Sequence, residues 1–188
     1  YHEHVSYFSA KSSYNLLKTA GLTITKIEVV DYHGGSLRIY ARKGKPRVSR
    51  SLKQHLDHEN KIGLFDPSTY NSFTSHILNE RNNFMKKVYD IKASGGSIIG
   101  VGAAAKGNTF LNFYNLDHSL VDYVTDISSF KQGKYTPLTR IPISGDDIFS
   151  HYKEVYALIL SWNISTQLKE ILRKINPKIK FISPCDED

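Results

Sequence analysis

Apolar and polar residues alternate along the first part of the chain in the pattern of a two-stranded hairpin. Leu22–Tyr32 is rich in β-branched residues, and residues 36–42 place apolar and basic side chains on opposite faces. The glycine pair between these runs predicts a tight turn. Before the hairpin we expect a serine-capped helix over residues 9–20, with Leu16 and Leu17 facing inward. These elements alone are too small to hold a core.

Two helices are predicted in the middle of the chain. One covers residues 48–61, after a break at residues 44–46 that is the best candidate for a domain boundary. The other begins at Asp66–Pro67, where a capping carboxylate precedes a proline in the first helical position. It extends to about Gly95, and its apolar stripe predicts packing against a core or another domain. The stripe consists of Tyr70, Phe73, Ile77, Phe84, Val88 and Ile91.

Strands and helices alternate in the rest of the chain. The apolar runs of strand length cover residues 97–101, 121–125, 155–160 and 178–182. The helical patterns between them cover residues 109–114, 147–152 and 165–174. This alternation predicts an α/β fold with a doubly wound, mostly parallel sheet of the Rossmann-like type. Ligands of such sheets bind outside the carboxyl ends of the strands.

Three segments follow the predicted strands and are candidates for that site. The first, Gly102–Asn108, contains the small residues of a β–α turn, whose backbone N–H groups and helix N-terminus favour a phosphate. It has neither the third glycine of a dinucleotide fingerprint nor the Gly-Lys-Ser/Thr of a P-loop, and an ordinary tight turn is the alternative. The other segments contain Asp126 with Ser128, and Ser161–Asn163.

Composition narrows the class of protein. The chain has 188 residues, 40% of them hydrophobic, which indicates a folded domain. No apolar run approaches the roughly 20 residues of a membrane span. With a single cysteine we expect no disulfide within the chain and a cytoplasmic protein. We also expect no metal site. The net charge of +7 suits an anionic partner. The basic stretch of residues 38–53 carries no nucleic-acid-binding signature, so neither a nucleic acid nor a membrane is expected as a partner.

Four motifs in order give the chain a specific resemblance over nearly its whole length. It resembles the S-adenosylmethionine-dependent sugar C-methyltransferases of deoxysugar biosynthesis, including the C-3 methyltransferases that act on thymidine-diphosphate-linked keto sugars. The motifs are Tyr1-His2-Glu3-His4-x-Ser6-Tyr7-x-Ser9, His33-Gly34-Gly35-Ser36-Leu37-Arg38, Gly102-Ala103-Ala104-Ala105-Lys106-Gly107-Asn108-Thr109, and Lys131-Gln132-Gly133-Lys134-Tyr135 with Ile141-Pro142-Ile143.

The resemblance implies a domain organisation. Residues 1–45 would be the C-terminal remnant of a methyltransferase domain, and residues 46–188 a Rossmann-like C-terminal domain. The chain is then expected to be a C-terminal fragment, inactive alone. S-adenosylmethionine would be bound mainly by the missing upstream domain, and zinc only by the missing N-terminal domain. The expected partner is a nucleotide-linked keto-deoxysugar, and the sequence carries no signal for an oligomeric state.

The resemblance also assigns site residues. It places the family's catalytic tyrosine, glutamate and histidine on Tyr1, Glu3 and His4. Methylation of a sugar carbon next to a ketone needs a base to form the enolate, and a histidine is suited to that task. The residues themselves leave two other interpretations, a solvated polar end and a metal site formed by His2 and His4 on one face of a strand.

The resemblance assigns the nucleotide-sugar site to the C-terminal domain. Lys106, Gly107 and Asn108 are expected to face the diphosphate or the sugar, and Lys131 would add a second cation. Two other classes stay open. One is a dinucleotide-binding oxidoreductase domain of the NAD(P) type, for which Asp126 has a suitable position. The other is a non-catalytic nucleotide-binding or interaction module on the same fold.

Overall fold

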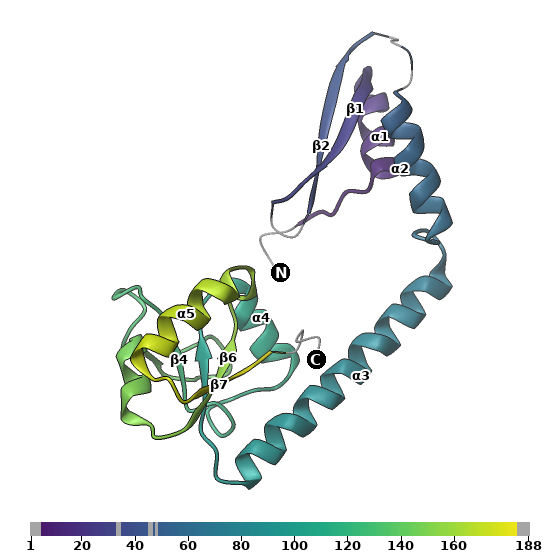
Figure 1. Cartoon of the computed structure of the whole chain (residues 1–188). Coiled ribbons are helices and arrows are strands. Elements are labelled where there is room, and N and C mark those ends of the chain that lie inside the picture. Colours follow the sequence, from purple (N-terminus) through teal and green to yellow (C-terminus); the bar gives the residue numbers. More distant parts are fainter. Residues whose placement is uncertain (1–4, 33–34, 45–46, 48, 184–188) are drawn as a thin grey trace. The chain divides into compact units, whose positions relative to one another are not determined.

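Figure 1 shows the computed structural model of the chain, which describes residues 5–32, 35–44, 47 and 49–183. The chain divides into two compact units, one up to His76 and the other from Ile77. The helix α3 (Pro67–Ala93) contributes residues to both units. No helix within the described residues is both long enough and apolar enough to cross a membrane.

The first unit contains two helices and an antiparallel hairpin. In the hairpin, Ile27 pairs with Ile39 and Val29 pairs with Leu37, which places apolar residues on a common face as predicted. Ser9 caps the first helix through the amide of Ser12. The elements are α1 (Ala10–Thr19), β1 (Leu22–Val30), β2 (Ser36–Lys43) and α2 (Arg50–Lys61).

The core of this unit is small and is shared by both helices and the hairpin. Its buried residues are Ala10, Ile24, Ile27 and Leu52. The prediction that Leu16 faces inward is wrong, since 55% of this residue is exposed. The inward stripe of α1 starts at Ala10 and recurs three, four and seven positions later, and Leu16 is not on it.

The second unit is built on a five-stranded parallel sheet, which confirms the predicted α/β class. The strands lie in the order β5-β4-β3-β6-β7, and every neighbouring pair is parallel. Counted along the chain, this order is 3-2-1-4-5, as in dinucleotide-binding folds. The strands are β3 (Ile98–Val101), β4 (Tyr123–Thr125), β5 (Ile143–Ser144), β6 (Val155–Ile159) and β7 (Ile179–Ile182).

Helices cover both faces of this sheet. On one face α3 and α4 (Ala105–Phe113) contribute Phe84, Val88 and Phe110 to a buried cluster with residues of β3, β4 and β6. On the other face the 3₁₀ helix η1 (Asp146–His151) and α5 (Ser165–Ile175) pack on β3, β6 and β7. Burial on both faces explains why β3 and β6 are apolar without alternation.

Three predicted elements differ from the structure. The helix expected at residue 109 begins at Ala105, so the lysine of the β–α turn lies in the first helical turn. The strand β5 was not predicted, because it has only two residues. The apolar stripe of α3 is buried only in its second half, since Tyr70 and Phe73 are 52% and 59% exposed.

The expected boundary between residues 45 and 46 refers to the domains of a longer protein and stays a prediction. Within the chain, the compact units divide at Ile77 instead. The reason is that Leu52 of α2 is buried against Ile24 and Ile27 of the hairpin.

Candidate functional site

The candidate site lies at the carboxyl edge of the parallel sheet, between β3 and β6. From β3 the chain continues through α4 to β4 on one side, and from β6 it continues through α5 to β7 on the other (Figure 1). The two connections therefore diverge at this point, and such a switch point is where open α/β sheets bind their ligands. The residues after β3 and the residues after β6 meet at this switch point.

The turn after β3 brings its backbone close to the end of β6. Gly102 has a φ of +94° and donates its N–H to the carbonyl of Thr125 at 2.8 Å. A Cβ at this position would overlap Oγ of Ser161. A glycine is therefore required both by the left-handed backbone and by the contact with Ser161.

The N-terminus of α4 carries no side-chain cap. Its N-cap residue is Ala104, and the first helical hydrogen bond runs from Asn108 N to the Ala104 carbonyl at 2.9 Å. The three preceding amides, Ala105 to Gly107, have no acceptor among the described residues. Such amides, together with the positive end of the helix, favour an anion.

Two of the predicted site residues occupy this first turn in different ways. Lys106 is partly exposed, and its Nζ lies 6.0 Å from the ring centroid of Trp162, which follows β6. Gly107 is buried, and a Cβ there would lie 2.8 Å from the Cβ of Leu160. Only the backbone of Gly107 is therefore available to a ligand. The proximity of Lys106 to Trp162 was missed by the sequence analysis.

Asn108 has an unsatisfied side-chain oxygen. Its Oδ1 is shielded from solvent and has no hydrogen-bond partner within the described part of the chain. A buried acceptor without a donor costs free energy unless a ligand or water supplies one. This oxygen is therefore a second candidate contact beside the uncapped helix end.

The ammonium of Lys131 is paired with two acceptors of the protein, and we call these contacts the clamp. Its Nζ donates to the carbonyl of Ala103 at 2.9 Å and to Oδ2 of Asp126 at 2.7 Å. The other carboxylate oxygen of Asp126 accepts the amide of Ser128. The clamp fixes the loop after β4 to the turn after β3, and the carboxylate offsets the lysine charge. The contact of Lys131 with a substrate stays a prediction.

The predicted catalytic residues Tyr1, Glu3 and His4, and the alternative ligand His2, lie outside the described residues. Among the residues that are described, no group of three His, Cys, Asp or Glu is placed to hold a metal ion.

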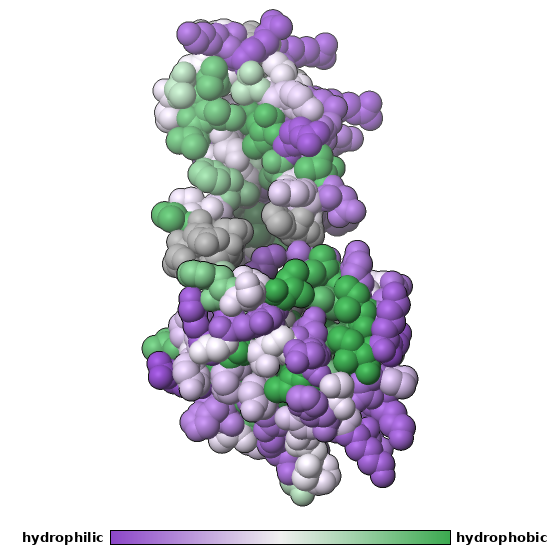
Figure 2. All heavy atoms as spheres, turned by 90° about the vertical axis from the view of Figure 1, so that its left-hand side faces the viewer, coloured by the Kyte–Doolittle hydropathy of each residue, from purple (hydrophilic) through white to green (hydrophobic). Residues whose placement is uncertain are grey.

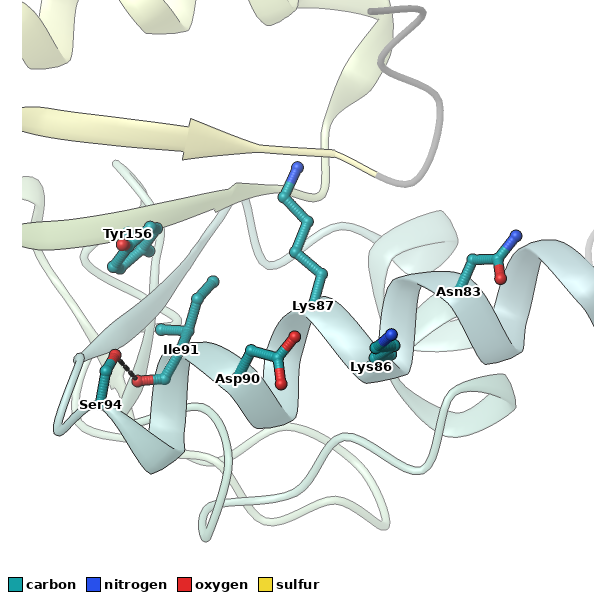
Figure 3. A pocket seen from close by; sticks show the side chains of 7 residues that line it. All are labelled: Asn83, Lys86, Lys87, Asp90, Ile91, Ser94 and Tyr156. Atoms are coloured by element: carbon teal, nitrogen blue, oxygen red, sulfur yellow. Dashed lines mark hydrogen bonds between the residues drawn. The ribbon is translucent and has the colours of Figure 1, made fainter.

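A cavity of about 460 Å³ in the second unit lies away from this edge. Figure 3 shows Lys86 and Lys87 on α3 beside it, with Tyr156 on β6 and Ser94 at its other end. Tyr156 is the second residue of β6, and Ser94 lies just before β3. This end of the cavity is therefore at the amino ends of the strands, opposite to the edge where parallel sheets bind ligands.

The strand order and the uncapped helix define a Rossmann-like unit whose carboxyl edge carries backbone amides without an acceptor among the described residues. Residues 31–185 match the family described as C-methyltransferase C-terminal domain, and the chain belongs to this family. Over 193 residues the chain is 30% identical to the C-methyltransferase NovU of Streptomyces niveus. All of the chain is covered, but it spans only 45% of that protein. The family predicted from the motifs is thereby confirmed as a C-methyltransferase C-terminal part.

Proposed function

We propose that the chain is the C-terminal part of an S-adenosylmethionine-dependent C-methyltransferase that acts on a nucleotide-linked keto-deoxysugar. The carbon that receives the methyl group lies next to a ketone and reacts as an enolate. The unit from Ile77 on binds the nucleotide diphosphate at the turn after β3. The observation that carries the proposal is the uncapped N-terminus of α4, with Lys106 in its first turn, at the switch point of the sheet.

The diphosphate is held by this chain's own groups in three ways. The free amides of Ala105 to Gly107 donate to its oxygens, and the ammonium of Lys106 adds a point charge. Lys131 keeps the turn in place through the Ala103 carbonyl. A nucleoside diphosphate thus anchors the substrate while its sugar extends away from the sheet edge.

The proton chemistry is assigned to the residues at the start of the chain. His4 removes the proton from the carbon next to the ketone, Glu3 orients the imidazole, and Tyr1 donates a hydrogen bond to the enolate oxygen. S-adenosylmethionine supplies an electrophilic methyl group. The described residues of this chain include no glycine-rich motif for that cofactor, which is why its binding is assigned to the upstream part, as is zinc.

A dinucleotide-binding domain is the second candidate, because the strand order fits it and Asp126 follows β4. In dinucleotide-binding domains this acidic side chain accepts a ribose hydroxyl. Here both of its carboxylate oxygens already accept hydrogen bonds, from Lys131 and Ser128. We therefore expect no tight binding of NADH, and a saturable change in NADH fluorescence at micromolar concentrations would favour this alternative.

Titration calorimetry of the full-length protein with a thymidine-diphosphate sugar tests the phosphate site. We expect Lys106→Ala to weaken binding about 10- to 150-fold, since a charged hydrogen bond contributes roughly 1.5–3 kcal/mol. Lys87→Ala is the matched control, because this lysine lines the other cavity (Figure 3). Unchanged affinity in the Lys106 variant would remove the phosphate role, and a loss confined to the Lys87 variant would move the site to α3.

His4→Asn in the full-length protein tests the base. We expect it to abolish methylation and also the exchange of solvent deuterium into the substrate carbon next to the ketone, because both need the enolate. Undiminished deuterium exchange would show that another group removes the proton.

A further inference from the structure

The single tryptophan of the chain follows β6 and lies beside the proposed phosphate-binding turn. We propose that Trp162 is the platform on which the nucleobase of the substrate stacks. The inference deepens the proposed function and rests on it, since it needs the diphosphate to lie at the N-terminus of α4. It assigns a specificity element to η2 (Trp162–Ile164), the short 3₁₀ turn that follows β6.

Small residues bring the segment after β3 and the segment after β6 together. Gly102 allows Ser161 to approach the turn after β3, and Gly107 allows Leu160 to pack directly against the first turn of α4. As a result the residue after Ser161 lies beside the helix end, with the Trp162 ring centroid 6.0 Å from Nζ of Lys106. One nucleoside diphosphate can contact both groups.

The indole is partly exposed. Trp162 is 40% exposed, and the Lys106 ammonium lies over its ring at 6.0 Å from the centroid, a long cation–π contact. An exposed aromatic ring beside a cationic, uncapped helix end combines the two features with which proteins hold nucleotides without reading a particular base.

The base, rather than the sugar, is the part of the substrate assigned to this ring. The sugar has to reach the methyl donor, and the described residues of this unit contain no motif that binds a methyl donor. The nucleotide end is therefore the part that stays at the sheet edge. Because every base has a π-face, the platform contributes affinity for nucleotides over simple phosphates and little discrimination among bases.

The test compares two ligands in titration calorimetry of the full-length protein: thymidine diphosphate and inorganic pyrophosphate. We expect Trp162→Ala to weaken thymidine diphosphate by about 5- to 100-fold, the range found when stacking aromatics are removed. Pyrophosphate affinity stays within about twofold, because it has no base to stack. Trp162→Phe keeps a π-face and restores most of the affinity, whereas Trp162→Leu keeps an apolar side chain without one and does not.

Tyr89→Ala is the control, because Tyr89 is 56% exposed on α3 and belongs neither to the turn after β3 nor to the segment after β6. Unchanged thymidine diphosphate affinity in both Trp162→Ala and Trp162→Leu overturns the inference. An equal loss of affinity for thymidine diphosphate and pyrophosphate also overturns the inference. Equal thymidine diphosphate affinities of Trp162→Phe and Trp162→Leu do the same, since either result means that Trp162 acts only on the fold. If Lys106→Ala weakens both ligands while the Trp162 variants weaken neither, only the inference fails. If the wild-type protein binds neither ligand, the proposed function fails as well.

Discussion

The two compact units differ in how completely they bury their apolar residues. The unit from Ile77 packs helices on both faces of a five-stranded sheet, with one buried cluster on each face. Among its described residues, the unit up to His76 has a two-stranded sheet and four buried hydrophobic residues. A single hairpin is not stable by itself, and one small cluster adds little. The comparison indicates that the core of the first unit is too small to make it stable by itself, whereas the second unit has a core on each face of its sheet.

The first unit also exposes apolar side chains. Figure 2 shows hydrophobic patches on the visible faces of both units. Exposed apolar patches are typical of a face that another part of a protein covers. Under the proposed function, that part is the methyltransferase domain upstream. The hydrophobic residues of this unit that are more than half exposed are Val5, Tyr7, Phe8, Leu16, Val29, Tyr32, Tyr70 and Phe73.

The largest expected effect comes from separating the two units. A fragment of residues 66–188 retains Asp66, whose Oδ1 caps α3 through the amide of Ser68 at 2.9 Å. We expect this fragment to unfold cooperatively in urea. We expect a fragment of residues 1–65 to have no cooperative transition, because four buried residues do not offset the chain entropy. Circular dichroism and hydrogen exchange measure both. A cooperative transition in the shorter fragment would show that its core is sufficient.

The next effect compares two buried leucines of the same chemistry. Leu158, on β6, is fully buried between neighbouring strands, and Leu52 of α2 is 1% exposed. We expect Leu158→Ala to lower the free energy of unfolding by about 3–5 kcal/mol. We expect Leu52→Ala to lower it by about 2–3 kcal/mol, because the partly buried neighbours of Leu52 can move into the space that its side chain leaves. Urea unfolding, with hydrogen exchange resolved by unit, measures both costs.

Leu138→Ala is the surface control for this pair, because Leu138 is 84% exposed. We expect it to change the free energy of unfolding by less than about 0.5 kcal/mol. A larger cost at Leu52 than at Leu158 would contradict the comparison of the two cores.

The sequence predicted the α/β unit well, because its strands are apolar runs separated by helical patterns. It failed where tertiary contacts decide the structure. Residues 104–107, Ala-Ala-Lys-Gly, contain no capping side chain, so nothing local marks the start of α4 at Ala105. Leu16 was placed inward because it is apolar, whereas Ala10 and Ser13 are the buried residues of α1.

The candidate site was predictable in its position but not in its pairings. The turn after β3 was identified from its small residues, and the strand alternation indicated the edge at which it lies. The clamp from Lys131 to Ala103 joins residues 28 positions apart, and no local pattern indicates it. The approach of Trp162 to Lys106 depends on β6 lying next to β3, which is a matter of strand order.

A third effect concerns a buried charge in the small core. Glu59 of α2 is 7% exposed, and its two oxygens accept the amides of Ala10 and Lys11 at the start of α1. Glu59→Gln leaves one of these amides facing an N–H₂ group, and we expect a loss of about 1–3 kcal/mol in the first unit. Faster hydrogen exchange of the backbone amides along α1 would measure this loss of stability. Asp57→Asn is the matched control, since Asp57 is an exposed acidic residue on the same helix.

The smallest effect is a pH dependence on the surface of the hairpin. Hydrogen bonds from the Lys26 ammonium and the Tyr40 hydroxyl hold the pKa of Glu28 below its ordinary value. A lowered pKa means that the unfolded state binds the proton more tightly. The stabilisation is therefore present above the ordinary carboxyl pKa and is lost as the pH falls through the lower pKa of the folded state. Because the pair is exposed and screened by salt, the change is small.

Carboxyl chemical shifts followed by NMR from neutral to acid pH measure this pKa directly in the full-length protein. We expect the midpoint of Glu28 to lie below that of an unpaired glutamate and to move toward it in 1 M salt, where screening is strong. Lys26→Ala removes the first hydrogen bond, so the midpoint rises. A midpoint that neither the substitution nor salt shifts would mean that the Lys26 pair does not form in solution, and the hairpin would then depend on its few buried residues alone.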